Sequence, residues 1–407
     1  MSTVTLSAHE CSALFGLPPI GDTVLSGRDA PPTFLVYCGD GVVLTHYMSA
    51  HPSTCVVKAD VCDGEASCVM HGAEAKHAAS MVGRNDSTLT IADGMITIST
   101  ATDTIKVSVE QSESYDAYVR TLLESRRSKT YRDRVDISCS ELSNGIKLAA
   151  TPTDNADHTP ALQRYIRLTI NDDAPCCRLA GYSPRLCVTT HVQVEHAPQH
   201  AWDFLLQPST LLAALAAVSG SSNMCSFQQP ERGSYCDLTI MQDGVDFFFR
   251  IPAIRAGDSE VGTMMTSIDN IWTRINKEET STVTIDGGSL AHAWSSALKV
   301  LGASGAQLQC GTRHCRVSST GNTVMSFYRD IPCVWGQQNF HNTHGKFAFP
   351  LRTTIVNTFV KAQSLSGSQS DMSLTYGEVQ SGAVFCMYET DHGETTIYSL
   401  MMTPEEG

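Results

Sequence analysis

The sequence predicts an α+β fold of three repeated domains, each with two helices packed on antiparallel sheets. Short apolar strands alternate with a few amphipathic helices, and this order of elements returns three times along the 407 residues. One pattern is almost duplicated: Leu89-Thr90-Ile91 precedes Asp93-Gly94, and Leu238-Thr239-Ile240 precedes Asp243-Gly244. Because a single hydrophobic core rarely grows to this length, we expect the repeats to be separate domains.

Composition limits the classes of function that the chain can have. Charged residues make up 17% and the formal net charge is −14, which excludes a surface that is cationic all over but not a local cationic stripe. The N-terminus lacks the basic start and apolar run of a signal peptide, and no run of about 18 apolar residues could span a membrane. We therefore expect a cytoplasmic protein whose fifteen cysteines are reduced thiols, many of them buried in strands.

The first domain is expected to cover residues 1–118. A short helix is predicted over Ser7–Leu17, and a second over Met70–Gly83, where alanines recur at helical spacing. Asp93-Gly94, flanked by alternating apolar residues, predicts a tight hairpin. Further strands are expected within Thr33–Ser49, on both sides of Gly39-Asp40-Gly41, and at Thr54–Val61 and Ile105–Val109.

The second domain is expected over residues 119–256, with a basic connector at residues 112–135. Residues 112–135 contain six Lys or Arg, a charge run that is usually a solvated face; a contact with nucleic acid is the alternative. Ser138-x-x-Glu141 is a capping box that predicts a helix, and Pro208–Ser219 predicts another. Gly-Tyr-Ser-Pro predicts a hairpin turn within Arg178–Val192, from which Tyr182 and Arg185 would stand out. Further strands are expected at Ala161–Ile170, Val192–Val194, Leu238–Ile240 and Val245–Phe249.

The third domain is expected over residues 257–407, after a loose connector at Ala256–Asn270. Apolar residues at helical spacing predict helices at Ser289–Gly302 and Pro350–Gln363. Strands are expected at Ala306–Cys310, Cys315–Val317, Thr323–Arg329, Met372–Tyr376, Ala383–Tyr388 and Thr396–Met402.

Three stretches resemble one known family, the sliding clamp of bacterial replicative DNA polymerases (the beta-subunit type). Leu179–Leu186 is similar to a turn that usually reads Ala-Thr-Asp-Gly-His-Arg-Leu-Ala in that family, and it keeps the Ala, Arg and Leu positions. Ile397–Met402 resembles the family's closing Tyr-Val-Val-Met-Pro, with Met in place of Pro. Phe347–Phe359 resembles the strand–helix unit of its last domain. The departures indicate a divergent member, such as one from a phage.

The resemblance implies DNA-clamp domains that form half of a ring, closed as a head-to-tail homodimer around double-stranded DNA. It implies a processivity factor and not an enzyme, without a cofactor, that tethers the replicative DNA polymerase and also binds the clamp loader. The dimer interface is expected at Ile105, Val107, Val300 and Leu301. The pocket for partner peptides is expected at Tyr182, Ser183, Arg185, Leu186, Tyr398, Ser399, Leu400, Met401 and Met402.

A ring that slides needs weak, delocalised attraction to phosphates and no reading of bases. The helices that line its hole should therefore carry sparse cations among small polar residues. The candidates, each of which could equally be an ordinary exposed residue, are Lys76, Arg84, Lys147, Lys299, Arg352 and Lys361.

A zinc- or cysteine-dependent enzyme, or another β-rich binding protein that does not act on DNA, is the alternative. Two groups could supply metal ligands: Cys55, Cys62, Cys68 and His71, and Cys310, His314 and Cys315. Neither has the paired Cys-x-x-Cys spacing of a zinc site, and thiols inside strands are the more ordinary interpretation. Phosphate-binding Gly-rich loops, His-Glu-x-x-His and Gly-x-Ser-x-Gly do not occur in the sequence.

Overall fold

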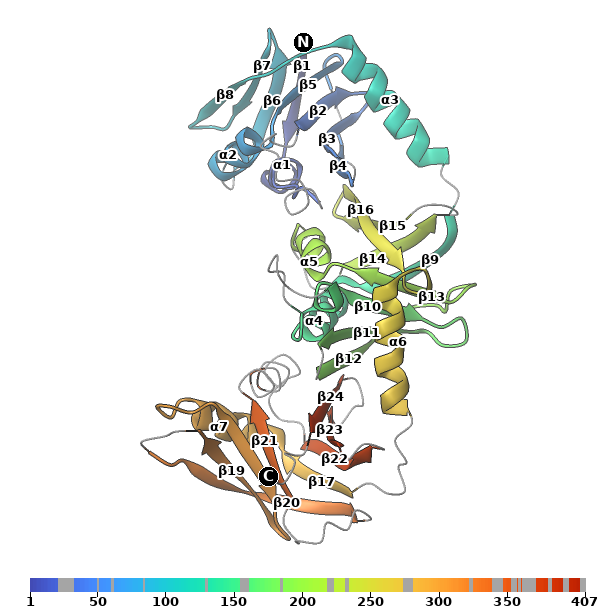
Figure 1. Ribbon diagram of the computed structural model, residues 1–407. Coiled ribbons are helices and arrows are strands. Elements are labelled where there is room, and N and C mark those ends of the chain that lie inside the picture. The colour runs from blue at the N-terminus through green and yellow to red at the C-terminus, as the bar shows by residue number, and fades with distance from the viewer. Residues whose placement is uncertain are drawn as a thin grey trace.

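The chain forms an arc of three domains that follow one another from the N-terminus to the C-terminus (Figure 1). This computed structural model describes residues 1–20, 33–49, 51–59, 62–82, 85–128, 131–153, 161–183, 186–217, 223–230, 234–273, 281–321, 325–338, 347–352, 357, 360, 371–379, 383–390 and 395–402. Each domain has two antiparallel sheets, and the same strand order returns in all three.

The first domain contains two four-stranded sheets. One has the order β1 (Ser2–Leu6), β6 (Ser87–Ala92), β7 (Met95–Ser99) and β8 (Thr104–Ser108). The other has the order β5 (Ala66–His71), β2 (Thr33–Gly39), β3 (Val42–Met48) and β4 (Ser53–Lys58). Helices α1 (Ala8–Phe15) and α2 (Gly72–Val82) pack against each other beside these sheets.

Local sequence signals determine where α1 begins and where the chain turns between β6 and β7. Ser7 caps α1 in a reciprocal capping box with Glu10, which satisfies two N-terminal backbone groups of that helix. Asp93 and Gly94 both have positive φ, 51° and 70°, as a two-residue hairpin turn requires. The predicted hairpin is confirmed.

The second domain repeats the plan. Its first sheet has the order β9 (Tyr131–Ser138), β14 (Met224–Pro230), β15 (Tyr235–Gln242) and β16 (Val245–Arg255). Its second has the order β13 (Trp202–Leu206), β10 (Ile166–Ile170), β11 (Cys176–Ser183) and β12 (Leu186–Gln193). Helix α4 (Cys139–Ala149), capped by Ser138 as predicted, lies beside α5 (Pro208–Ala216).

The third domain has the same two sheets. One has the order β17 (Ser281–Asp286), β22 (Asp371–Val379), β23 (Ala383–Thr390) and β24 (Thr395–Met402). The other has the order β21 (Phe347–Arg352), β18 (Gly305–Cys310), β19 (His314–Thr320) and β20 (Tyr328–Gln338). Helix α7 (Gly287–Leu298) packs on β18, β19 and β20.

Backbone hydrogen bonding continues across both domain boundaries. Strand β4 of the first domain pairs with β16 of the second, from Ser53 opposite Phe249 to Val57 opposite Val245. Strand β12 of the second domain pairs with β24 of the third in the same antiparallel way. We call these two places the first seam and the second seam. Each joins neighbouring domains into one continuous sheet.

Two helices replace segments that the sequence analysis treated as connectors. Helix α3 (Glu113–Ser128) occupies most of the basic connector, and α6 (Glu260–Thr273) occupies the loose connector. Both lie on the opposite side of the arc from α1, α2, α4, α5 and α7 (Figure 1). The domain boundary expected at residue 118 falls inside α3.

Because α3 and α6 cover the outer faces of their sheets, the strands below them are buried on both faces. In β2, Phe34 and Val36 belong to the main core, whereas Leu35 and Tyr37 contact Val119 of α3 in a separate cluster. Such strands have apolar residues in continuous runs instead of alternating with polar ones.

The predicted helix at Pro350–Gln363 begins as a strand. Pro350 lies in β21, opposite Gln307 of β18. Proline is tolerated there because β21 has one strand neighbour among the described residues and so lies at a sheet edge. Asn357 and Val360 are helical, and the other residues of 353–363 lie outside the described part of the chain.

Candidate functional site

The concave side of the arc is lined by helices α1, α2, α4, α5 and α7 (Figure 1). Their spans contain Glu10, Glu74 and Glu141 as acidic residues and Lys76 and Lys147 as basic ones, and Lys299 caps the C-terminus of α7. With Asp286, the N-cap of α7, counted as well, the described part of this layer has four acidic and three basic groups and a formal charge of −1, against −14 for the whole chain. The helix layer is therefore much less repulsive to a polyanion than the average surface of the protein.

The four carboxylates of this layer all lie at helix N-termini, three in first turns and Asp286 at the N-cap of α7. Glu10 accepts a hydrogen bond from the Ser7 backbone N–H at 2.7 Å, and Glu74 accepts one from the His71 N–H at 3.1 Å. A negative charge at a helix N-terminus is offset by the helix dipole. The described lysines lie farther along their helices or at the end.

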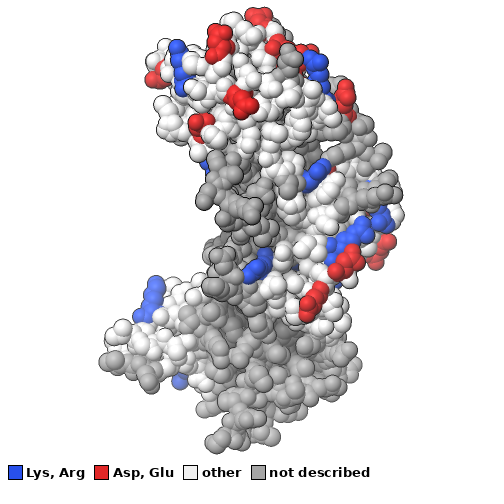
Figure 2. Space-filling model, turned by 45° about the horizontal axis from the view of Figure 1, so that its top comes forward, with Lys and Arg blue, Asp and Glu red and all other residues white. Residues whose placement is uncertain are grey.

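The structure places the predicted DNA-facing residues unevenly. Lys76, Lys147 and Lys299 are exposed on the concave helices or at their ends. Arg352 belongs to strand β21 and not to a helix, because the chain there pairs with β18. Arg84 and Lys361 lie outside the described residues. In Figure 2, Asp and Glu are spread over the first domain, and on the convex side of the second domain they lie beside Lys and Arg.

The second seam brings together the two stretches expected to form the partner pocket. Leu186 lies opposite Ser399, and Cys187 lies opposite Tyr398, although some two hundred residues separate them in sequence. Leu400, Met401 and Met402 continue β24 along β23. The predicted meeting of the turn and the terminal strand is confirmed; Arg185 lies outside the described residues, and the pocket itself stays a prediction.

Tyr182 does not stand out from the sheet, and that expectation was wrong. Its side chain is fully buried, and its hydroxyl donates to the Asp269 carboxylate of α6 at 2.9 Å. Arg178 donates to the same carboxylate at 2.9 Å, and Arg167 lies 3.4 Å from it. Helix α6 covers the position where the hydroxyl was expected to be accessible.

The cluster of Arg178, Tyr182 and Asp269 shifts the pKa values of its members. Burial raises the pKa of the Tyr182 hydroxyl above its ordinary value, so the group stays protonated and donates. Burial is the largest single influence on Arg178 and would lower its pKa, but the hydrogen bonds to Asp269 and the charge interactions with its neighbours together raise it. The cluster is therefore an ion pair that fixes α6 on the sheet.

Sequence reasoning missed Asp269 because the stretch around it was interpreted as a loose connector. A signal was present: Val261, Met265 and Ile268 recur at helical spacing and pack under α6 against the sheet. This apolar stripe would have predicted a helix, and Asp269 beside it would then have faced the same side.

The residues expected at the dimer interface lie at the two ends of the arc. Leu301 is 76% exposed just after α7, and Val300 is half-buried. Ile105 belongs to the core of the first domain, and Val107 packs partly against it. In the described residues β8 pairs only with β7, which leaves its other edge without a strand neighbour.

Four of the cysteines considered as metal ligands are core residues, whereas His71 and His314 are exposed. Cys55 and Cys68 are buried in the main core, and burial raises the pKa of Cys68 to about 12. Cys310 and Cys315 are buried in the core of the third domain. Within the described ranges, no three His, Cys, Asp or Glu side chains are placed to hold a metal ion. No helix of these ranges is long and apolar enough to cross a membrane.

Comparison with solved structures identifies the fold. The chain superposes on the DNA polymerase III beta subunit of Thermotoga maritima with a TM-score of 0.70 and 11% identity, over 99% of this chain and 100% of that one. The DNA polymerase sliding clamp of Pseudomonas aeruginosa gives 0.71 and 8%, with the same coverage. The Helicobacter pylori beta clamp, solved bound to a DNA ligase peptide, gives 0.69 and 11%, again over 99% and 100%. No protein-family model and no curated protein sequence matches the chain. The chain therefore has the sliding-clamp fold, at very low sequence identity.

Proposed function

We propose that this protein is a sliding clamp, in which two chains close head to tail into a ring of six domains around duplex DNA. The observation that carries the proposal is the three-domain arc, which matches bacterial clamps over nearly its whole length. The ring would tether the replicative DNA polymerase and raise its effective concentration at the primer end, without catalysing a reaction itself. It would act in the cytoplasm, and a clamp loader would place it on DNA.

The repeat supports a specific way of closing the ring. Strand β8 has the position in the first domain that β16 has in the second and β24 in the third, and both of these strands pair across a seam. Strand β20 has the position in the third domain that β4 and β12 have in the others. We infer that β8 of one chain pairs with β20 of the other, in the same antiparallel way as the strands at the first and second seams.

Exposure of β20 fits this inference. Tyr328 and Val334 of β20 are large apolar side chains that are 65% and 71% exposed. A seam at β20 would cover these side chains and bring them beside Val107. Leu301 and Val300 would add apolar contact at the same end of the arc.

Attraction to DNA would come from isolated lysines on a nearly neutral helix layer. Lys76, Lys147 and Lys299 can each neutralise phosphates without reading bases, which is what sliding requires. The second seam would receive peptide segments of the polymerase and the clamp loader, between the turn at Ser183 and Leu186 and the strand at Leu400–Met402. Methionines suit such a pocket because they adapt to varied partner side chains.

Encirclement can be tested by topology. Protein loaded at micromolar concentration on nicked circular DNA should survive a high-salt wash and should slide off once the circle is cut. Binding through phosphates alone would be lost to salt on both substrates. Equal retention on circular and linear DNA would refute the ring.

Assembly is tested independently by mass. Light scattering should give about twice 44.0 kDa, and Val334→Glu together with Leu301→Glu should shift the protein towards monomer. A matched pair of exposed substitutions away from both ends, Met241→Glu with Met264→Glu, should leave the dimer intact. A strictly monomeric wild type would contradict the proposal.

A further inference from the structure

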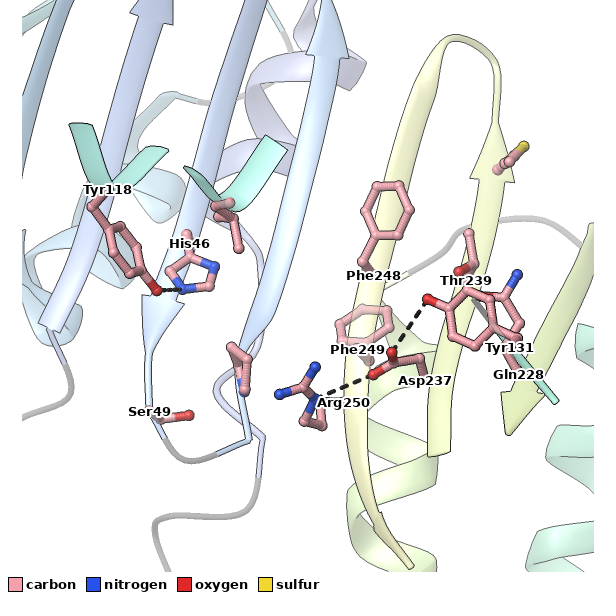
Figure 3. Close-up of a pocket in the computed structure, with 13 residues that line it drawn as sticks. His46, Ser49, Tyr118, Tyr131, Gln228, Asp237, Thr239, Phe248, Phe249 and Arg250 are labelled. Carbon is pink, nitrogen blue, oxygen red and sulfur yellow. Dashed lines mark hydrogen bonds and ion pairs between the residues drawn. The ribbon is translucent and has the colours of Figure 1, made fainter. Parts of the chain in front are cut away.

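A cavity of about 420 Å³ lies at the first seam, on the side of the arc that α3 covers. Residues of both domains line it: His46 and Tyr118 belong to the first domain, and Asp237, Phe248 and Arg250 to the second (Figure 3). We call it the first-seam cleft. Its volume is in the range that binds small molecules or a few side chains.

The floor of the first-seam cleft is polar and organised. Asp237 is 8% exposed; it accepts hydrogen bonds from Arg250 Nε at 3.2 Å and from the Tyr131 hydroxyl at 3.3 Å. On the other wall, the ring nitrogen Nε2 of buried His46 lies 3.0 Å from the Tyr118 hydroxyl (Figure 3). The guanidinium of Arg250 also stacks on Tyr235, at 4.1 Å from the ring centroid. These contacts hold the polar groups in fixed positions.

The upper walls are apolar and partly open to solvent. Phe248 and Leu122 are half-buried, Tyr118 is 38% exposed, and Met241 is 63% exposed. A few fixed polar groups below apolar walls are the usual composition of a binding site. Met241 can adapt its shape to a bound side chain.

The first-seam cleft occupies the same place in the repeat as the pocket expected at the second seam. Ser53, the first residue of β4, lies opposite Phe249, as Leu186, the first residue of β12, lies opposite Ser399. Arg250 and Leu400 are the next residues of β16 and β24. The backbones at the two seams are therefore equivalent, and at the first seam the ion pair of Asp237 and Arg250 lies in the floor of the cleft.

We propose that the first-seam cleft is a second docking site, which binds a short segment of a partner protein carrying an uncharged amide side chain, Gln or Asn, beside a Leu or Phe. Asp237 and Arg250 give the floor one negative and one positive charge. A ligand carboxylate would be repelled by Asp237, and a ligand ammonium by Arg250, whereas an amide can donate to the first and accept from the second. The apolar residue of the segment would lie between Phe248, Leu122 and Met241. This inference goes beyond the proposed function and needs neither the ring nor DNA.

Photocrosslinking can locate the site directly. The probe is the peptide acetyl-Gly-Ser-Gln-Leu-Phe-Gly-Ser amide with a benzophenone on its Phe ring, added to the full-length protein, and crosslinks are mapped by mass spectrometry. We expect crosslinks within residues 239–250. Matched peptides with Glu or Lys in place of Gln should lower the yield there at least threefold, because each brings a like charge to the floor.

Two variants of similar exposure separate the cleft from the rest of the surface. Met241→Glu should reduce the crosslink at 239–250 at least tenfold, whereas Met81→Glu, which changes an exposed methionine of α2, should not change it. Crosslinks only at 395–402, or equal yields with both variants, would overturn the proposal. If the protein crosslinks within residues 239–250 but is retained equally on circular and linear DNA, the proposed ring would be refuted and the proposed docking site would still be supported.

Discussion

Asp269 holds α6 on the second domain, and its replacement should loosen that helix measurably. In Asp269→Asn the side chain keeps its size but loses its charge, so that Arg178 and Tyr182 face a weaker acceptor. A hydrogen bond to a charged group contributes about 1.5–3 kcal/mol, and the carboxylate accepts from both side chains. The side chains of Asp269 and Arg178 are 20% and 30% exposed, so solvent screens part of this interaction. We expect the free energy that holds α6 on the sheet to fall by about 2–3 kcal/mol.

Hydrogen exchange of the α6 amides measures this quantity directly. Since about 1.4 kcal/mol corresponds to a factor of ten, peptides covering residues 260–273 should exchange about 30 to 140 times faster in Asp269→Asn. Tyr182→Phe removes only the hydroxyl and should give a smaller increase, and the double variant should be less than additive because the two groups share one interaction. Asp172→Asn, in an exposed turn of the same domain, is the control and should change nothing. Unchanged exchange in Asp269→Asn would mean that apolar packing alone holds α6 and would refute this account.

Three further predictions follow from single positions. Gly181→Ala should destabilise the second domain by about 2 kcal/mol or more, because the added Cβ would lie 1.8 Å from the Ala149 carbonyl oxygen. Gly257→Ala, whose added Cβ meets no atom within 4 Å, is the control and should be tolerated in the same thermal unfolding measurement. Asp286→Ala should lower the stability of the third domain by about 1 kcal/mol by removing the N-cap of α7. Hydrogen bonding to Ser289 lowers the pKa of Asp286 below its unfolded value. The stability that Asp286 contributes is therefore present above the unfolded pKa and is lost as the pH falls through the lower folded pKa. The urea midpoints of the wild type and Asp286→Ala should converge in acid. Because burial raises the pKa of Cys68 to about 12, iodoacetamide should modify Cys68 only after urea unfolding, and peptide mapping that finds it alkylated in the native protein would contradict its place in the core.

Local signals in the sequence predicted much of the fold. The Asp-Gly turns and the cap at Ser138 act over a few residues, so they could be interpreted without the rest of the chain. The short strands β1, β5, β13 and β17 were missed or merged into their neighbours, because strands of five or six residues give weak periodic signals. Pro350 was assigned to a helix because nothing local indicates that the chain there pairs with β18.

The sites were harder to predict, because they depend on contacts between distant segments. The resemblance of Leu179–Leu186 and Ile397–Met402 to a known family was enough to predict that they meet at the second seam. The burial of Tyr182 depends on α6, and the polar floor of the first-seam cleft depends on residues from β3, β9, β15 and β16. Such groupings exist only once the sheets are assembled, and single-sequence patterns do not report them.

The continuous sheets at the two seams have a mechanical consequence. Eight strands are hydrogen-bonded side by side across the first seam, in the spatial order β5, β2, β3, β4, β16, β15, β14 and β9. Strand β16 also pairs with β13 of the neighbouring sheet. Bending one chain at a seam would break a row of backbone hydrogen bonds and expose Phe247 and Val57, so the arc resists deformation within itself. In a ring of two such arcs, a gap wide enough to admit a duplex would open where the chains meet, at β8 and β20. The ease of opening the ring would then depend on the pairing of the five-residue strand β8 with β20 of the other chain, while the three domains of each chain move together.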